Sequence, residues 1–264
     1  MRAGRAYGPK LLDGLAHDRL RVRFAGPGAD LCAAQRLRFR AFRARGSAEA
    51  AGIDGDEFDA RALHVLVEEI AGGRLLCCFR LLHFTQGREV AGSYSAQFYD
   101  LVGLARLAAP MIEMGRFCVA EGVRDPDVLR LAWAALAHRV AASGAAMLFG
   151  CSSFRGTDAA PHAEAFALLG AEHVAPRCWR PRVKAPGVLR LPPRPLRDRP
   201  DRPAALRAMP PLLRSYLAMG ARVSDHAVVD RDLDTLHVFT GLEIRKVPGA
   251  RARRLGPGIA AVPA

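Results

Sequence analysis

Glu113 and Arg116 are the side chains whose types and spacing best suit acid–base chemistry. They lie in an apolar run, residues 112–119, that is typical of a buried strand. Residues three apart point to opposite faces of a regular strand, so both reach one site only if the strand carries a bulge, which Gly115 between them is expected to permit. The carboxylate is then a candidate general base and the guanidinium a candidate anion ligand. A plain Arg–Glu ion pair on an edge strand is the structural alternative.

A second group of charged side chains lies in the acidic stretch 53–59, which contains Asp54, Asp56 and Asp59. Carboxylates at this density suit binding of an ammonium group. A calcium loop is the alternative, but the stretch lacks the twelve-residue spacing of an EF-hand.

Several other chemistries are disfavoured by spacing. The six cysteines show no CxxC pair, which argues against a zinc site and favours reduced thiols. Cys118 and Cys151 have no histidine near them in sequence, so a cysteine nucleophile is a minor alternative. None of the eight histidines is followed by aspartate five residues later; His226, with Asp230 four residues on, is interpreted as structural or as a support to the site. No metal site is expected.

The elements that must position these residues follow from local patterns. Asp125 and Pro126 open the clearest helix, which carries apolar residues at helical spacing and ends at Gly144. Asp30 is the expected N-cap of a helix over 31–45. Strands are expected at 21–25, as an edge strand, and at 63–70, 74–84, 112–119, 146–151, 223–230 and 235–244. Further helices are expected within 92–110, 161–169 and 212–219. The order strand, loop, helix, strand at 112–151 predicts one βαβ crossover among hairpins.

The net charge of +13 over 264 residues points to an acidic partner, although Arg-rich composition alone is the simpler explanation. Nucleic acid is disfavoured because aromatic residues make up only 7% of the chain and do not alternate with a basic patch. Residues 181–211 hold nine prolines and seven arginines, so we expect either a solvated insertion or a basic lip that faces an acidic partner.

Location follows from what the sequence lacks. No apolar run approaches the ~20 residues that span a bilayer. The first residues carry no apolar core of a signal peptide. We therefore expect a cytoplasmic protein that is peripherally attached to the inner membrane through the arginines of 181–211.

Six stretches together resemble the ornithine-lipid type of amino-acid Nα-acyltransferase, a family related to acyl-homoserine-lactone synthases and, more distantly, to GCN5-related acetyltransferases. The resemblance covers about residues 20–247. The stretches are Arg38-x-x-x-Phe42, residues 54–59 (DGDEFD), 79–82 (FRLL), 113–119 (EMGRFCV), 148–154 (LFGCSSF) and 223–232 (VSDHAVVDRD).

This resemblance implies an α/β (α+β) acetyltransferase-like fold. We expect a mixed, mostly antiparallel sheet with helices on both faces and a bulged, splayed central strand, whose exposed backbone N–H groups form an oxyanion hole. The domain is expected at 20–247, with the insertion at about 181–211, after a basic lead-in at 1–19 and before a tail at 248–264.

The resemblance also implies roles for particular residues. A base must take a proton from the attacking amine, and Glu113 is the first candidate, with Asp56 and Asp59 as alternatives. The acceptor's carboxylate calls for Arg80 or Arg116. A side-chain ammonium calls for Asp56, Asp59 or Asp225. Arg38 and Phe42 share a helix face at i,i+4 and are expected to line the thioester entrance, unless they form an ordinary amphipathic surface. The motifs add Phe117, Cys118, Val119, Ser152 and Ser153 to the expected substrate-binding residues.

The loop at 121–127 bears on the acyl donor. Acetyltransferases that use coenzyme A hold its pyrophosphate on a Gly-rich turn before a helix. Here that turn has one glycine, and Asp125, Pro126 and Asp127 begin the helix, which disfavours a pyrophosphate. The resemblance indicates acyl carrier protein as donor, so no separate cofactor is expected and 4′-phosphopantetheine arrives on the carrier.

The expected function is transfer of a 3-hydroxyacyl group from acyl carrier protein to the α-amino group of ornithine, in ornithine lipid biosynthesis. The enzyme alternatives are another acceptor, such as glutamine, lysine or glycine, and acyl-homoserine-lactone synthesis. The latter is disfavoured because the N-terminal third lacks tryptophan. The non-enzyme alternative is a basic module that binds membranes or carrier protein.

Overall fold

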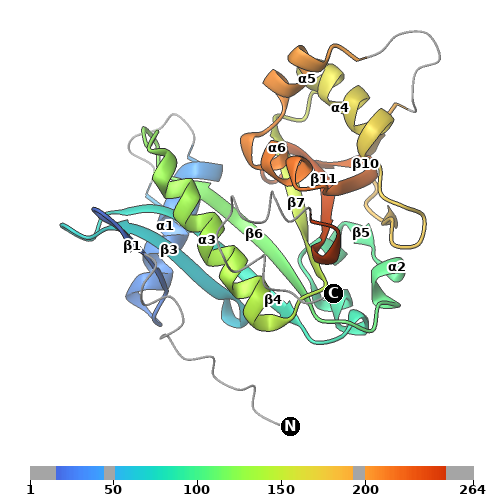
Figure 1. Ribbon diagram of the computed structural model, residues 1–264. Coiled ribbons are helices and arrows are strands. Elements are labelled where there is room, and N and C mark those ends of the chain that lie inside the picture. Colours follow the sequence, from blue (N-terminus) through green and yellow to red (C-terminus); the bar gives the residue numbers. More distant parts are fainter. Residues whose placement is uncertain (1–15, 45–50, 193–199, 248–264) are drawn as a thin grey trace.

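The computed structural model describes residues 16–44, 51–192 and 200–247. Its centre is a nine-stranded sheet with the strand order β1-β2-β3-β4-β6-β7-β11-β10-β9 (Figure 1). Neighbouring strands run antiparallel except β6 and β7, which run parallel. The strands are β1 (Ala16–His17), β2 (Leu20–Phe24), β3 (Leu63–Glu69), β4 (Leu75–Phe84), β6 (Met111–Val119), β7 (Met147–Arg155), β9 (Val188–Arg190), β10 (Arg222–Asp230) and β11 (Thr235–Glu243). Two short strands, β5 (Tyr99–Asp100) and β8 (Arg182–Val183), pair separately. The predicted mixed, mostly antiparallel sheet is confirmed.

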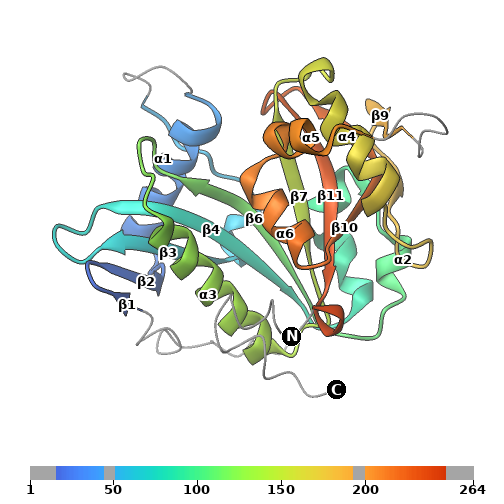
Figure 2. The same cartoon turned by 45° about the horizontal axis from the view of Figure 1, so that its top comes forward.

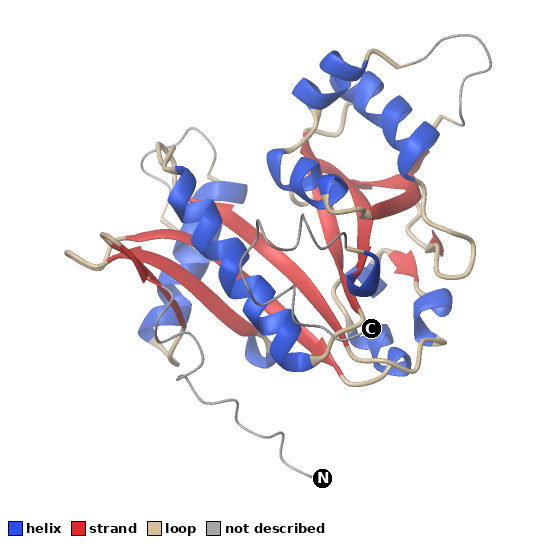
Figure 3. Ribbon diagram, viewed as in Figure 1, coloured by secondary structure: helices blue, strands red, loops and turns tan. Residues whose placement is uncertain are grey.

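Helices cover both faces of this sheet, as expected (Figures 2 and 3). The helices are α1 (Ala29–Phe42), α2 (Val102–Ala105), α3 (Pro126–Ser143), α4 (Ala163–Leu168), α5 (Arg202–Ala208) and α6 (Pro211–Ala218). Side chains of α3 and α6 share one core with alternate residues of β3, β4 and β11. Helix α1 packs on the opposite face of β4 and β6. The 3-10 turns η3 (Gly87–Gly92) and η4 (Ser95–Gln97) contribute to a further core on that second face.

Local signals set the ends of α3 as predicted. The Asp125 side chain accepts a hydrogen bond from the N–H of Asp127, Pro126 occupies the first turn, and Gly144 ends the helix with φ 63°. The expected cap of α1 is wrong. Gly28 occupies the N-cap position, and Asp30 lies inside the helix, where its carboxylate pairs with Arg23 at 2.5 Å. The Asp30 carboxylate, which the sequence predicted to cap the helix, instead forms an ion pair with Arg23 of the neighbouring strand β2.

Other elements follow the expected order with small differences. Both hairpins, β3–β4 and β10–β11, form as predicted. The strand expected at 21–25 lies inside the sheet between β1 and β3. Strand β7 is longer than expected and reaches Arg155. The predicted lead-in at 1–19 is described only from residue 16, and the expected tail at 248–264 lies outside the described residues.

The Pro/Arg-rich stretch is partly built into the fold. Strand β9 adds the outermost strand of the sheet, where proline-rich sequence is tolerated. Helix α5 packs on α4, with Ala205 and Met209 buried in a core below both. Residues 193–199 of this stretch lie outside the described part. Within the described part, no helix has the length and apolar content that crossing a bilayer requires.

A bulge interrupts the pairing of β4 with β6. Cys78 pairs with Cys118 and Arg80 pairs with Gly115, so between these pairs one residue of β4 faces two of β6, Arg116 and Phe117. The expected bulge is confirmed, but the residue that permits it is not the expected one. Arg116 adopts the left-handed conformation with φ 54°, whereas Gly115 does not. A non-glycine residue in this region carries strain that its surroundings must hold.

Strands β6 and β7 separate soon after they meet. They pair only from Met111–Met147 to Glu113–Phe149, although both strands continue for six more residues. At the last point of contact, Gly150 lies against the carbonyl of Met114, and a Cβ on Gly150 would overlap that oxygen. The expected splay is therefore present, and its closed end is held by a glycine.

This close approach predicts that Gly150→Ala is destabilising. An extra methyl must push the two strands apart, and overpacking of this kind costs about 1–3 kcal/mol. For a domain of this size the melting temperature should fall by roughly 3–10 °C in a thermal unfolding experiment. Gly187→Ala is the matched control, because its Cβ would lie 3.6 Å from Val229, an ordinary contact. Equal melting temperatures for both variants would contradict this account.

Candidate functional site

A cavity of about 320 Å³ opens where β6 and β7 separate. Alternation along β7 divides its wall between the two faces of the sheet. Cys151 and Ser153 belong to the face that carries the 3-10 turns, and Ser152 and Phe154 belong to the face that carries α6. The cavity therefore has walls on both faces, and the splay is the passage between them.

The wall on the α6 face is mainly apolar, and we call it the apolar side. Its residues are Met114, Phe117, Ser152, Phe154, Pro210, Pro211, Leu212, Leu213, Tyr216 and Thr240. The Phe117 ring stacks on Phe79 at 5.5 Å between centroids. Its hydroxyls bond within this side, since Thr240 donates to Ser152 at 2.9 Å and Tyr216 to the Met114 sulfur at 3.6 Å. This side suits a hydrocarbon chain.

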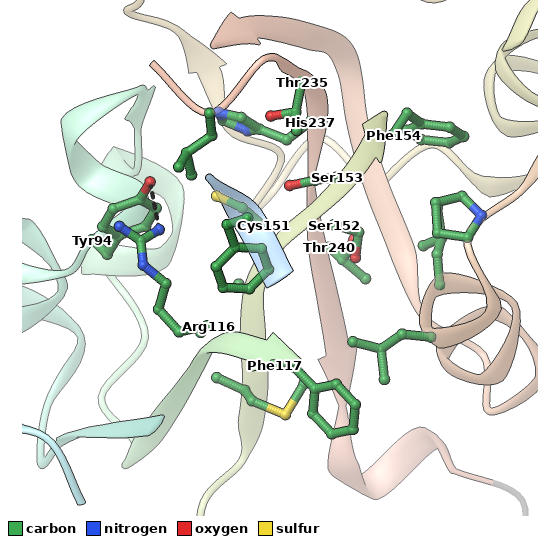
Figure 4. A pocket seen from close by; sticks show the side chains of 18 of the residues that line it. Tyr94, Arg116, Phe117, Cys151, Ser152, Ser153, Phe154, Thr235, His237 and Thr240 are labelled. Atoms are coloured by element: carbon green, nitrogen blue, oxygen red, sulfur yellow. Dashed lines mark hydrogen bonds between the residues drawn. The ribbon is translucent and has the colours of Figure 1, made fainter. Parts of the chain in front are cut away.

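The wall on the other face is polar, and we call it the polar side (Figure 4). Its residues are Arg80, Tyr94, Glu113, Arg116, Cys151, Ser153, Arg155, Asp230, Thr235 and His237, with Phe42 and Leu233 at its margins. The Arg116 guanidinium lies 5.0 Å from the centroid of the Tyr94 ring and donates to the Tyr94 hydroxyl at 3.3 Å. Burial, partly offset by Arg116, raises the pKa of Tyr94 to about 12, so its hydroxyl stays protonated.

Three arginines of α1, β4 and β6 are held by the acidic loop, in what we call the Arg–Asp network. Its members are Arg38, Arg80, Arg116, Asp54, Asp56 and Asp59. Arg38 donates to Asp59 at 2.8 Å and to Asp54 at 3.1 Å. Arg80 binds Asp56 at 2.8 Å and Asp59 at 2.6 Å. Arg116 lies 2.9 Å from Asp54 and 3.3 Å from Asp56.

The network fixes the charge state of Asp54 and Asp59. Burial opposes ionisation of Asp59, but hydrogen bonds from Arg38 and Gln35 outweigh it and hold the pKa of that carboxyl well below its usual range. Asp54 is likewise buried, and Arg116 and Arg38 lower its pKa. These carboxylates are therefore charged and already paired near neutral pH.

Glu113 lies at the closed end of the splay with 2% of its surface exposed. One of its oxygens accepts from the Tyr94 N–H at 2.8 Å, and the other from the Ser95 N–H at 2.7 Å and hydroxyl at 2.5 Å. The Ser95 hydroxyl also lies 3.4 Å from the Cys151 thiol. Burial raises the pKa of Glu113, although the hydrogen bonds from Ser95 oppose the shift.

The structure brings many of the expected residues together around this cavity. Phe42, Arg80, Glu113, Arg116, Phe117, Ser152 and Ser153 line it. Asp56 and Asp59 lie behind the wall, where each binds Arg80.

Four expected residues lie elsewhere. Arg38 is 1% exposed inside the network and does not line an entrance with Phe42, because two carboxylates hold it in the interior. Cys118 packs under α1 with its sulfur 3.5 Å from that of Cys78, and Val119 packs against the core below α3. Asp225 lines a separate basic hollow, where it lies 3.3 Å from Arg190.

Sequence reasoning did not select Tyr94, Arg155, Asp230, Thr235 or His237 of the polar side. Tyr94 lies in irregular backbone, which left no pattern to detect. Arg155 lies beyond the expected end of β7. Asp230, Thr235 and His237 occupy the predicted hairpin, where the strand register was the available signal. Pairing outward from the turn places Asp230 opposite Thr235, and alternation then places His237 on the same face.

The chain is similar to several known proteins. Residues 37–134 match the family described as acetyltransferase (GNAT) domain. The chain is 32% identical to an L-ornithine N(alpha)-acyltransferase of Rhodobacter capsulatus over 83% of this chain and 87% of the relative. It is 31% identical to the enzyme of the same name from Brucella abortus over 86% and 85% of the two chains.

Among solved structures, a CoA-dependent acyl-homoserine lactone synthase, MesI, aligns over 88% of this chain and 87% of its own, with 12% identity and a TM-score of 0.43. A likeness at that level carries no information about substrates. The identities to the curated relatives extend over most of both chains, and they show that the chain belongs to the family of L-ornithine Nα-acyltransferases.

Proposed function

We propose that this protein transfers a 3-hydroxyacyl group from acyl carrier protein to the α-amino group of ornithine, which yields the lyso precursor of an ornithine lipid. The observation that carries the proposal is the two-sided cavity at the splay, in a chain whose curated relatives bear the name L-ornithine N(alpha)-acyltransferase. The apolar side suits the acyl chain and the polar side suits a charged amino acid. The reacting thioester is assigned to the passage between them.

In this arrangement the amine attacks the thioester carbonyl from the polar side. The new C–N bond forms, the C–S bond breaks, and the carrier leaves as a thiol after it takes up a proton. Backbone N–H groups along the open edge of bulged β6 are the candidate oxyanion donors. Glu113 is the candidate base for the amine proton, because burial raises its pKa towards the range in which a base works best.

The proposed donor is acyl carrier protein rather than coenzyme A. The first turn of α3, where coenzyme A would need backbone N–H groups, carries Asp125 and Asp127. The Asp125 carboxylate is itself bound by Arg19 at 2.7 Å. Carrier proteins present their pantetheine through a single phosphodiester and are acidic, which suits a chain of net charge +13.

A purified-protein assay tests the proposed reaction. We expect 3-hydroxyacyl carrier protein and ornithine to give free carrier thiol and an N-acyl product of the corresponding mass. Glutamine, lysine and glycine are the parallel acceptors, and 3-hydroxyacyl-coenzyme A is the parallel donor. Thiol release with another amino acid instead of ornithine would show that this other amino acid is the acceptor. Reaction with coenzyme A but not with the carrier would contradict the donor.

Glu113→Gln tests the base. Glutamine keeps the size of the side chain and one oxygen that can accept from Ser95, but its amide nitrogen cannot accept the Tyr94 N–H, so the melting temperature of the variant is measured beside its activity. Loss of a general base should lower kcat about 100-fold or more. Because the base acts when deprotonated, wild-type activity should fall as pH drops through a pKa above the ordinary value for glutamate, about 4.3.

Glu57→Gln is the control, because Glu57 is exposed in the acidic loop and does not line the cavity. It should keep wild-type kcat. If Glu113→Gln also keeps kcat within a few fold, Glu113 only positions the turn at Ser95 and another group accepts the proton.

We also propose that the protein attaches peripherally to the anionic inner face of the membrane. Exposed arginines of the Pro/Arg-rich stretch, Arg182 and Arg207 among them, support this, because each basic residue near an anionic surface contributes about 1 kcal/mol. Sedimentation with anionic vesicles should occur at low salt and decline as salt shortens the screening length. The double variant Arg182→Glu, Arg207→Glu should sediment less than Arg74→Glu, which changes an exposed arginine of the β3–β4 turn. Binding that ignores salt would contradict the proposal.

A further inference from the structure

The polar side of the cavity continues beyond Ser153 along the β10–β11 hairpin. Asp230 pairs with Thr235, and His237 pairs with Ser153 of β7. Because side chains two residues apart share a face, Asp230, Thr235 and His237 all lie on the polar face, and all three line the cavity. Figure 4 shows Thr235 and His237 at the end of the cavity away from Phe117. None of these residues belongs to the Arg–Asp network.

Asp230 differs from the other carboxylates of this region. It is 7% exposed, and one of its oxygens, Oδ1, accepts the N–H groups of Asp232 at 3.0 Å and Leu233 at 3.1 Å. Among the described residues, no arginine, lysine or histidine forms an ion pair with it. Asp56 and Asp59, in contrast, are each bound by arginine. Asp230 and Glu113 are the two acids of the cavity wall, and neither forms an ion pair within the described residues; both oxygens of Glu113 are bound by the turn at Ser95, whereas Asp230 receives its hydrogen bonds through Oδ1.

His237 presents an acceptor without a partner. The Tyr99 hydroxyl donates its proton to the His237 carbonyl at 2.8 Å, because a carbonyl can only accept. The 3.1 Å contact between that hydroxyl and Nδ1 then requires the proton on Nδ1, which leaves Nε2 as a lone pair. Nε2 is buried and has no partner in the described part of the chain.

Two further facts fit a cationic ligand. Burial, reinforced by His226, lowers the pKa of His237 to about 4, so the ring is neutral near pH 7 and does not repel a cation. The Thr235 hydroxyl is also buried without a partner among the described residues. Buried polar atoms that lack a partner are rare in proteins, and two on one cavity wall indicate that a ligand supplies the missing hydrogen bonds.

We propose that Asp230, Thr235 and His237 form the subsite for the side-chain ammonium of a dibasic acceptor amino acid. The inference rests on the proposed function and names the part of the cavity that selects its acceptor. A carboxylate, a hydroxyl and an imidazole lone pair offer three acceptors to the three N–H bonds of an ammonium group. His237 pairs with Ser153, which lies two residues beyond Cys151 on β7. At about 3.3 Å per residue this is ~7 Å along the strand. The carbon chain of a five-carbon amino acid can extend over that distance from Cys151 to His237.

A further charge lies beside this subsite, on Arg155. This residue pairs with Thr235 across β7 and β11, lines the cavity, and is exposed. The guanidinium groups of Arg80 and Arg116 are engaged by aspartates, whereas no carboxylate of the described residues forms an ion pair with Arg155. Arg155 thus lies level with the ammonium subsite and four residues along β7 from Cys151, so the α-carboxylate, which shares its carbon with the reacting amine, is not assigned to it.

The test compares ornithine with norvaline, which has the same carbon chain but no distal amine. We expect Asp230→Asn to lower the ratio of kcat/KM for ornithine to kcat/KM for norvaline by about 10- to 100-fold, the range for a lost hydrogen bond to a charged group. Asparagine keeps an oxygen for the N–H groups of Asp232 and Leu233, so the hairpin turn should persist. Thr235→Val should lower the ratio by about 2- to 10-fold.

Asp234→Asn is the matched control, because Asp234 lies in the same turn, does not line the cavity, and has φ 48°, which asparagine tolerates. Its ratio should equal that of the wild type. A wild-type ratio in Asp230→Asn, with a wild-type melting temperature, would overturn the subsite. If that variant does not fold, an unchanged ratio in Thr235→Val overturns it.

Failure of the proposed function would be visible separately, in the wild type. Carrier-thiol release with neutral amino acids but with neither ornithine nor lysine would remove the dibasic acceptor, and the subsite with it. Release with lysine in place of ornithine would keep the subsite, and the ratio would then be measured against norleucine.

Discussion

The pairing of three interior arginines with the acidic loop is the interaction on which the site depends. Arg38, Arg80 and Arg116 come from α1, β4 and β6, and the loop at 54–59 joins all three. Arg38 and Arg80 are almost wholly buried, so removal of one partner would leave an uncompensated charge in the interior, at a cost of about 3–5 kcal/mol. The same contacts hold Arg116 in its left-handed conformation, and so they fix the bulge that turns β6 away from β7.

Two features of adjacent strands, Gly150 of β7 and the bulge of β6, produce the splay. Gly150 allows β7 to touch β6 at Met114, and the bulge at Arg116 carries β6 away immediately afterwards. On the other side of the opening, β7 stays paired with β11 along its whole length. A nine-stranded sheet thus opens in its middle without exposing its core.

The sequence predicted those features that depend on local signals. Asp125, Pro126 and Gly144 fix α3 by themselves, and the spacing of Glu113 and Arg116 required a bulge. It did not predict the partners of buried charges, because these come from distant segments. Arg38 was assigned to an entrance and Asp225 to the substrate, yet each is engaged by oppositely charged groups elsewhere in the fold. The acceptors on the β10–β11 hairpin required its register and its contact with β7, and neither follows from composition.

The opening through the middle of the sheet affects how substrates enter and how the product leaves. Because the apolar and polar sides lie on opposite faces, the sheet separates the binding region for the acyl chain from the binding region for the charged amino acid. Under the proposed function, the acyl donor and the amino acid enter from opposite faces of the sheet, so neither substrate blocks the binding of the other. The amphiphilic product would bridge the sheet, with its tail on one face and its charged head on the other, so it must be drawn through the gap to leave. Such an architecture then slows product release rather than the chemical step.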